Sequence, residues 1–107
     1  MKIENVLQKF IVLLEKKEYF EAHGVLEHIW LEMKKDGHQY ANLARGLINA
    51  AVAFEHIKRA TPTAMTKARK AFAGYTKYRH ICDDADCNFK SACKKADEIA
   101  ATLGLFF

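Results

Sequence analysis

YFEAHGVLEHIW, residues 19–30, is the stretch that decides the fold of this 107-residue chain. Its apolar side chains recur every three or four residues, which places them on one face of an α-helix. The pattern predicts a helix from about Tyr19 to Lys34 that buries this face in a core. The expected core residues are Tyr19, Ala22, Leu26, Ile29, Trp30 and Met33.

Two polar residues accompany that apolar face. His23 and Glu27 are four residues apart, so a helix brings their side chains to the same side. Gly24 lies beside them, although a glycine inside a helix costs roughly 1 kcal/mol relative to alanine. An imidazole next to a carboxylate can form a buried hydrogen-bond network, bind a small ligand or partner, or hold a metal and transfer protons.

A second helix, from about Tyr40 to Arg59, is the expected neighbour of the first. Its centre, GLINAAVAF, is apolar almost all round, as in the most buried helix of a bundle. Asn49 and His56 are seven residues apart and share one face. If the two helices are antiparallel neighbours, a buried polar cluster forms between them. Its candidate members are His23, Glu27, Trp30, Asn49 and His56, with Glu55 nearby.

The remaining chain has the same helical period. Apolar stripes predict helices over about 3–15, from Thr61-Pro62 to near Arg79, and over about 88–103. Thr61 followed by proline suggests a helix start, Met65 is expected in the core, and an aspartate before residue 88 could cap the last helix. No alternating strand pattern is present. We expect an all-α, single-domain bundle of about five helices with short connections, covering residues 1–107.

Composition and targeting signals favour an ordinary cytoplasmic protein. Half of the residues are apolar and 28% are charged. The longest apolar run, 47–54, is far shorter than the roughly 20 residues of a membrane helix, so no membrane association is expected. We see no signal peptide at the N-terminus. The three cysteines all lie within residues 82–93, an odd and clustered set that does not suggest a disulfide scaffold.

The cysteines invite a metal hypothesis of their own. His80, Cys82, Cys87 and Cys93 lie within fourteen positions. Their gaps differ from the short spacings of zinc knuckles, and no CxxC redox motif is present. Cys93 also falls on the apolar face of the last helix, where a free cysteine behaves as a small hydrophobe. We therefore expect neither a metal nor redox chemistry here.

Charge is distributed unevenly along the chain. The net charge is +4, with −1 in residues 1–57 and +5 in residues 58–107. A basic half can bind nucleic acid, but no arginine-rich cluster or nucleic-acid motif accompanies it, so a solvated lysine face is favoured. The basic residues expected on this face are Lys67, Lys70, Lys77, Arg79, Lys90, Lys94 and Lys95.

Two motifs resemble a known family. YFEAHGVLEHIW is similar to the pattern Y-x-E-A-H-E-x-x-E-x-x-W of domain of unknown function 309. ARGLINAAVAFEH is similar to its second pattern, L-Q-G-L-I-Q followed by small residues and two histidines. The resemblance spans about residues 10–75. It implies a small all-helical protein of bacteria or archaea without an established activity.

Several positions match the family pattern and others depart from it. The matching residues are Tyr19, Glu21, Ala22, His23, Glu27, Trp30, Gly46, Leu47, Ile48 and His56. The departures are Gly24, Ala44, Arg45, Asn49 and Glu55, most of which remove or shorten polar groups. If the family has a catalytic or metal site, the resemblance implies that this chain has weakened it.

These patterns favour a binding or scaffolding module rather than an enzyme. The partner is an unknown protein or small molecule, with a homo-oligomer as one option. Docking could use an exposed apolar patch of Phe20, Leu31 and the tail Phe106-Phe107. A metal-dependent, hydrolase-like enzyme using His23, Glu27 and His56 is the alternative, and nucleic-acid binding by the basic half is a second one. No phosphate loop or dinucleotide motif is found, and no cofactor is expected.

Overall fold

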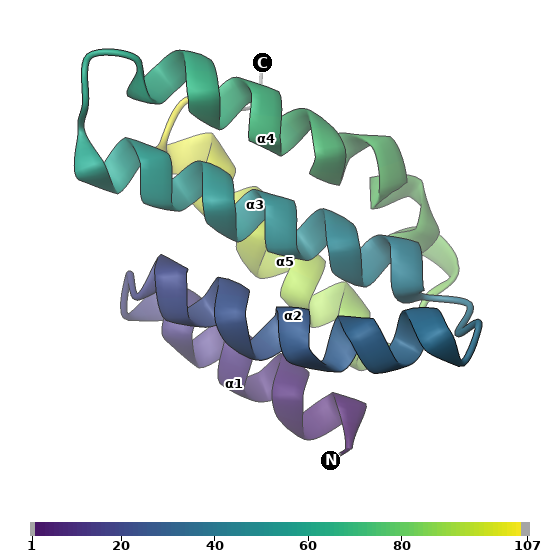
Figure 1. Cartoon of the computed structure of the whole chain (residues 1–107). Helices are drawn as coiled ribbons and strands as arrows, with labels where there is room; N and C mark the ends of the chain where they lie inside the picture. Colours follow the sequence, from purple (N-terminus) through teal and green to yellow (C-terminus); the bar gives the residue numbers. More distant parts are fainter. Residues whose placement is uncertain (1, 106–107) are drawn as a thin grey trace.

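The computed structural model describes residues 2–105 and is an all-α bundle, as predicted (Figure 1). Its α-helices are α1 (Ile3–Glu15), α2 (Tyr19–Lys35), α3 (Ala41–Arg59), α4 (Ala64–Tyr78) and α5 (Cys87–Thr102). A short 3-10 helix, η1 (Arg79–Asp84), joins α4 to α5. For α1, α2, α3 and α5, the predicted bounds agree with these to within about one residue.

The central element is α3, which packs against α2 on one side and α4 on the other (Figure 1). Its small residues Ala50, Ala51 and Ala53 are fully buried, which lets neighbouring helices approach closely. At Gly46, an added Cβ would lie 3.3 Å from the Cα of Tyr75, so the α3–α4 contact is made by backbone. The apolar centre of this helix therefore organises the bundle, as its sequence suggested.

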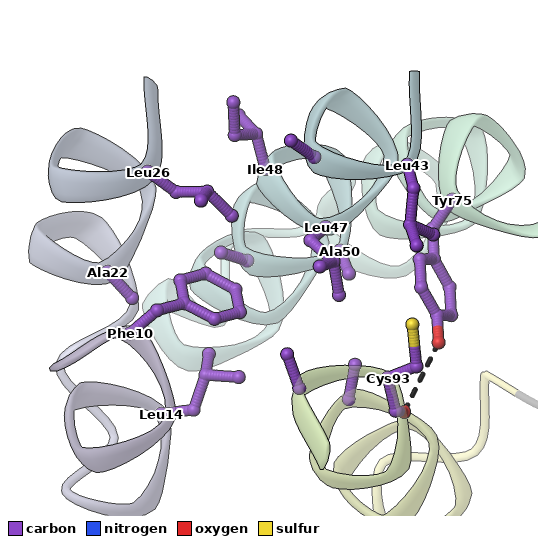
Figure 2. Packing of buried hydrophobic residues seen from close by; sticks show 14 of the residues in the cluster. Phe10, Leu14, Ala22, Leu26, Leu43, Leu47, Ile48, Ala50, Tyr75 and Cys93 are labelled. Atoms are coloured by element: carbon purple, nitrogen blue, oxygen red, sulfur yellow. Dashed lines mark hydrogen bonds between the residues drawn. The ribbon is translucent and has the colours of Figure 1, made fainter. Parts of the chain in front are cut away.

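The core is one cluster to which the five α-helices all contribute. Figure 2 shows Phe10 and Leu14 of α1, Leu26 of α2 and Leu47 of α3, which all belong to this cluster. All four side chains are at most 1% exposed. Burying an apolar side chain of this size contributes about 1.5–3 kcal/mol, so this cluster stabilises the packing of α1 on α2 and α5, and of α2 on α3.

One polar network ties α4 to α5. The buried Tyr75 hydroxyl donates to Asp97 Oδ1 at 2.7 Å and lies 3.2 Å from the carbonyl oxygen of Cys93 (Figure 2). Arg79 donates to the same carboxylate through Nε and Nη2. Burial and the bond to Asp97 raise the pKa of the Tyr75 phenol well above its ordinary range. The phenol therefore stays protonated as the donor of this link.

The predicted start of α4 was wrong. The helix begins at Ala64, and Thr61-Pro62 form a preceding turn in which Ala64 N donates to the Thr61 carbonyl at 2.9 Å. The buried residues of α4 are Ala64, Ala68, Phe72 and Tyr75. Met65 was expected in the core but is 36% exposed, whereas Ala64, one position earlier, is buried.

The expectation of free cysteines was also wrong for two of the three. Cys82 of η1 and Cys93 of α5 form a disulfide, while Cys87 is free and exposed. The 3-10 helix turns the chain back along α5, which cysteine spacing alone cannot reveal. The expected aspartate cap is confirmed: Asp86 accepts hydrogen bonds from the backbone N–H groups of Asn88 and Phe89.

Two further observations complete the fold. Leu105 is 4% exposed and packs on the core, whereas the Phe106-Phe107 part of the predicted tail lies outside the described residues. None of the helices between residues 2 and 105 has both the length and the apolar character to cross a bilayer.

Candidate functional site

His23 and Glu27 form a pair on the surface of α2. His23 Nε2 and Glu27 Oε2 are 3.0 Å apart, one helical turn from each other. The side chains are 26% and 49% exposed, so both remain in contact with solvent. The pair is a hydrogen bond when the imidazole is neutral and an ion pair when it is protonated.

His56 faces the same region from α3. A hollow of about 170 Å³ lies between the two helices. Its lining residues are Tyr19, Phe20, His23, Val52, Glu55, His56 and Arg59. The structure thus brings His23 and His56 to one hollow, while Glu27 stays outside its lining.

The charge of Glu55, which pairs with Arg59 in the lining of the hollow, also acts on Tyr19 at its floor. Arg59 Nε donates to Glu55 Oε2 at 2.9 Å, so these two charges largely neutralise each other. The pKa of the Tyr19 phenol is raised by burial and by the negative charge of Glu55. The floor therefore presents a neutral aromatic ring rather than an acid or base.

Two predicted cluster members lie elsewhere. Asn49 lies against Gly74 of α4, where a Cβ would collide with its amide. Trp30 is half-buried, with Lys34 Nζ 5.3 Å and Arg45 Cζ 6.0 Å from its ring centroid. Asn49 and His56 share a face of α3 as expected, but Asn49 contacts α4 whereas His56 lies beside α2.

The predicted burial of the cluster was wrong. Apart from tyrosines, no polar or charged side chain in residues 2–105 is buried. A polar group with access to water needs no protein partner, so a buried network does not fix the register of α2 on α3. Whether these residues bind anything stays a prediction.

Neither proposed set of metal ligands comes together in the structure. Within the described part of the chain, no three His, Cys, Asp or Glu side chains are placed to hold a metal ion. His23, Glu27 and His56 do not converge in this way. In the second candidate set, Cys82 and Cys93 are bonded to each other, and His80 and Cys87 are both exposed.

The basic half is partly neutralised by ion pairs. Arg79 pairs with Asp97, and Lys95 lies 3.7 Å from Glu15 and 3.3 Å from Glu98. These contacts reduce the free positive charge that nucleic acid would meet. Nucleic-acid binding stays a prediction, and the reduced free charge makes it less favoured.

Exposed apolar side chains on α2 form the other notable feature. Phe20 is 62% exposed and Leu31 is 55% exposed, as the sequence predicted. The ring of Phe20 lies 5.9 Å from that of His23, at the edge of the hollow. Sequence reasoning missed the roles of Tyr19, Val52 and Arg59, because helical periodicity shows a face but not which neighbour it meets.

A second hollow lies along the opposite edge of α2. It measures about 400 Å³ and is lined by Asn5, Val6, Lys9, Gly24, Val25 and His28. A Cβ added to Gly24 would have no neighbour within 4 Å. The unusual mid-helix glycine was the sequence signal for this opening.

Comparison with known families agrees with the motifs. Residues 7–68 match the family described as Domain of unknown function (DUF309). This confirms the family that the resemblance predicted. No curated protein and no solved structure matches the chain.

Proposed function

The chain belongs to the DUF309 family, and from its surface we propose that it is a protein-binding or scaffolding module rather than an enzyme. The observation that carries this proposal is the exposed Phe20 ring standing beside an apolar hollow between α2 and α3. Exposed aromatic side chains beside a pocket are typical anchors of protein interfaces.

The size of the hollow indicates a side chain as its occupant. Pockets for small molecules usually measure about 300–1,000 Å³. At about 170 Å³, this hollow has room for roughly one large side chain. A projecting residue of a partner protein therefore fits better than a metabolite.

The charges around the hollow indicate an apolar occupant. Glu55 is paired with Arg59, and His23 with Glu27. With these charges compensated, a cationic or anionic side chain would gain little there while losing its hydration. A leucine-like or aromatic side chain would instead bury apolar surface against Tyr19 and Val52.

The enzyme alternative has less support. A general acid or base must reach the reacting atom within hydrogen-bond distance. His23 already contacts Glu27, and no third group completes a set of ligands within residues 2–105. A prokaryotic source, which the family resemblance implies, and a cytoplasmic location belong to the proposal.

Side-chain analogues test this proposal without a known partner. We would titrate 3-methylbutan-1-ol and p-cresol, which mimic leucine and tyrosine, and follow NMR shifts of Tyr19, His23 and Val52. Saturable shifts with a dissociation constant of about 1 mM or weaker are expected for ligands this small. N-methylguanidine should give none.

A matched pair of variants makes the test specific. Val52→Phe should fill the hollow and abolish the response. Met65→Phe, at an exposed position on α4, should leave it unchanged. Absence of saturable shifts, or an unchanged response in Val52→Phe, would contradict the proposal.

A further inference from the structure

We propose that the partner is a second copy of this chain, paired antiparallel through the exposed stripe of α2. The stripe consists of Phe20, Gly24, Glu27 and Leu31. This inference rests on the proposed protein-binding function and assigns a partner to the α2 surface beside the hollow, with which the stripe shares Phe20.

The stripe is symmetric about its own midpoint. Its residues follow at intervals of four, three and four. At 100° per residue they fall within about 60° of one another on the helix surface. Phe20 and Leu31 at the ends are both apolar and more than half exposed. A stripe of this kind can pair with its own antiparallel copy in register.

A two-fold axis across the stripe pairs apolar residues at its ends and a small residue with a long one at its centre. It places Phe20 level with Leu31 of the second copy, so apolar side chains meet at both ends. It places Gly24 level with Glu27 of the second copy, so a residue without a side chain faces the longest one. Such an isologous interface uses the same patch on both subunits and closes at the dimer.

Gly24 is explained by this arrangement and not by the monomer. Inside its own chain, a Cβ at residue 24 would meet nothing within 4 Å, so no packing contact requires glycine there. A small residue at the crossing point of two helices lets their backbones approach closely. The hollow beside Gly24, about 400 Å³, leaves further room on that flank.

Charges on the other flank are also complementary. His23 lines the hollow between α2 and α3, and Glu27 of the stripe is paired with it. The two-fold axis keeps this flank on the same side in both copies. It brings Glu27 of the second copy next to His23, so that each carboxylate meets imidazoles of both chains. The self-pairing therefore adds a second carboxylate beside each imidazole, as well as the apolar contacts.

The interface area available on α2 sets the expected affinity of the dimer. A helix of 17 residues is about 25 Å long. Two such helices crossing at one stripe bury an area at the low end of specific interfaces. We expect a dimer with a dissociation constant of roughly 100 µM, so that the dimer fraction depends on protein concentration.

Sedimentation equilibrium of the full chain tests the pairing. From about 10 µM to 1 mM, the wild-type mass should rise from one chain towards two. Leu31→Asp should keep the mass of one chain throughout, while Met65→Asp, the same change on α4, should behave as wild type. Gly24→Glu should also remain monomeric because its carboxylate faces that of Glu27. Gly24→Ala should still associate.

The outcomes separate this inference from the proposed function. A wild-type chain that stays monomeric up to 1 mM overturns the pairing, as does a Leu31→Asp variant that associates like wild type. The analogue titration of the hollow is then repeated on Leu31→Asp. Saturable binding there supports the protein-binding function whatever the oligomeric state, and its absence contradicts that function.

Discussion

Glycine shows how identical residues can have opposite roles in neighbouring helices. Gly46 of α3 lies against the backbone of Tyr75, while Gly24 of α2 faces open space. Both are single glycines inside apolar helical patterns, so the sequence does not distinguish them. Only the position of the neighbouring helix does, which makes the pair a test of the packing.

We therefore expect alanine to act in opposite directions at these two sites. Gly24→Ala should raise the free energy of unfolding by up to about 1 kcal/mol, because it adds helix propensity without a clash. Gly46→Ala should lower it by about 1–3 kcal/mol, because the Tyr75 backbone cannot easily move. Urea denaturation at equal m-values measures both. A stabilising Gly46→Ala would show that the α3–α4 contact is looser than described.

Individual residues were predictable where a single helix determines their environment. The exposure of Phe20 and Leu31 followed from their position outside the apolar stripe of α2. Trp30 counted as core by the same reasoning but is half-buried, with Arg45 of the next helix over its ring. A cation from another element can hold an aromatic ring at the surface, and periodicity contains no information about it.

At the scale of elements, the sequence predicted what local interactions determine. Helical period and caps are local, so α1, α2, α3 and α5 were predicted closely. Thr61-Pro62 has the composition of a helix start yet forms a turn before α4. The 3-10 helix over residues 79–84 has no apolar period that would predict it, because Cys82 is its one buried residue.

The disulfide of that element supports a stability prediction. Cys82 and Cys93 are separated by 11 residues. A loop of this size corresponds to about 2–3 kcal/mol through the entropy of the unfolded chain. Cys93→Ser should therefore lower the free energy of unfolding by this amount under oxidising conditions and by much less with reductant. Urea unfolding in both conditions, with a thiol count of the native protein, measures it.

Cys87→Ser provides the matched control. Cys87 is free and exposed in the same segment, so its replacement should change neither stability nor the redox dependence. The result also bears on the proposed cytoplasmic location, where thiols are usually kept reduced. If wild type showed the same stability with and without reductant, the disulfide would contribute nothing to the fold.

For the whole molecule, the fold could be predicted from the sequence, but the candidate site only in part. The bundle followed from five periodic segments that must bury their apolar faces together. To predict the site, one would need to know which helices are neighbours and which of their residues lie level with each other. His23 and His56 do line one hollow, but Asn49, on the same face of α3 as His56, lies against α4 instead. Contacts between elements depend on their relative placement, which no single helix encodes.

Because Tyr75 links α4 to α5, the stability of the whole bundle should fall at alkaline pH. The pKa of Tyr75 lies above the ordinary value of 10.0, chiefly because of burial and then of its bond to Asp97. The folded chain thus keeps a proton that the unfolded chain releases above pH 10. The stabilisation by Tyr75 is complete below about pH 10 and falls as the pH rises further, by about 1.4 kcal/mol per pH unit for one proton.

Tyr75→Phe isolates this effect. At pH 7 the variant should be less stable by about 1–2 kcal/mol, because Asp97 and the Cys93 carbonyl each lose a donor. Between pH 10 and 11 its stability should fall less steeply than that of wild type. Tyr19, whose pKa is also raised by burial and by Glu55, is present in both proteins and does not affect the comparison. Urea unfolding from pH 8 to 11 gives both slopes. Equal slopes would show that the Tyr75 proton is not held by the fold, and the α4–α5 link would then rest on Arg79 and Asp97 alone.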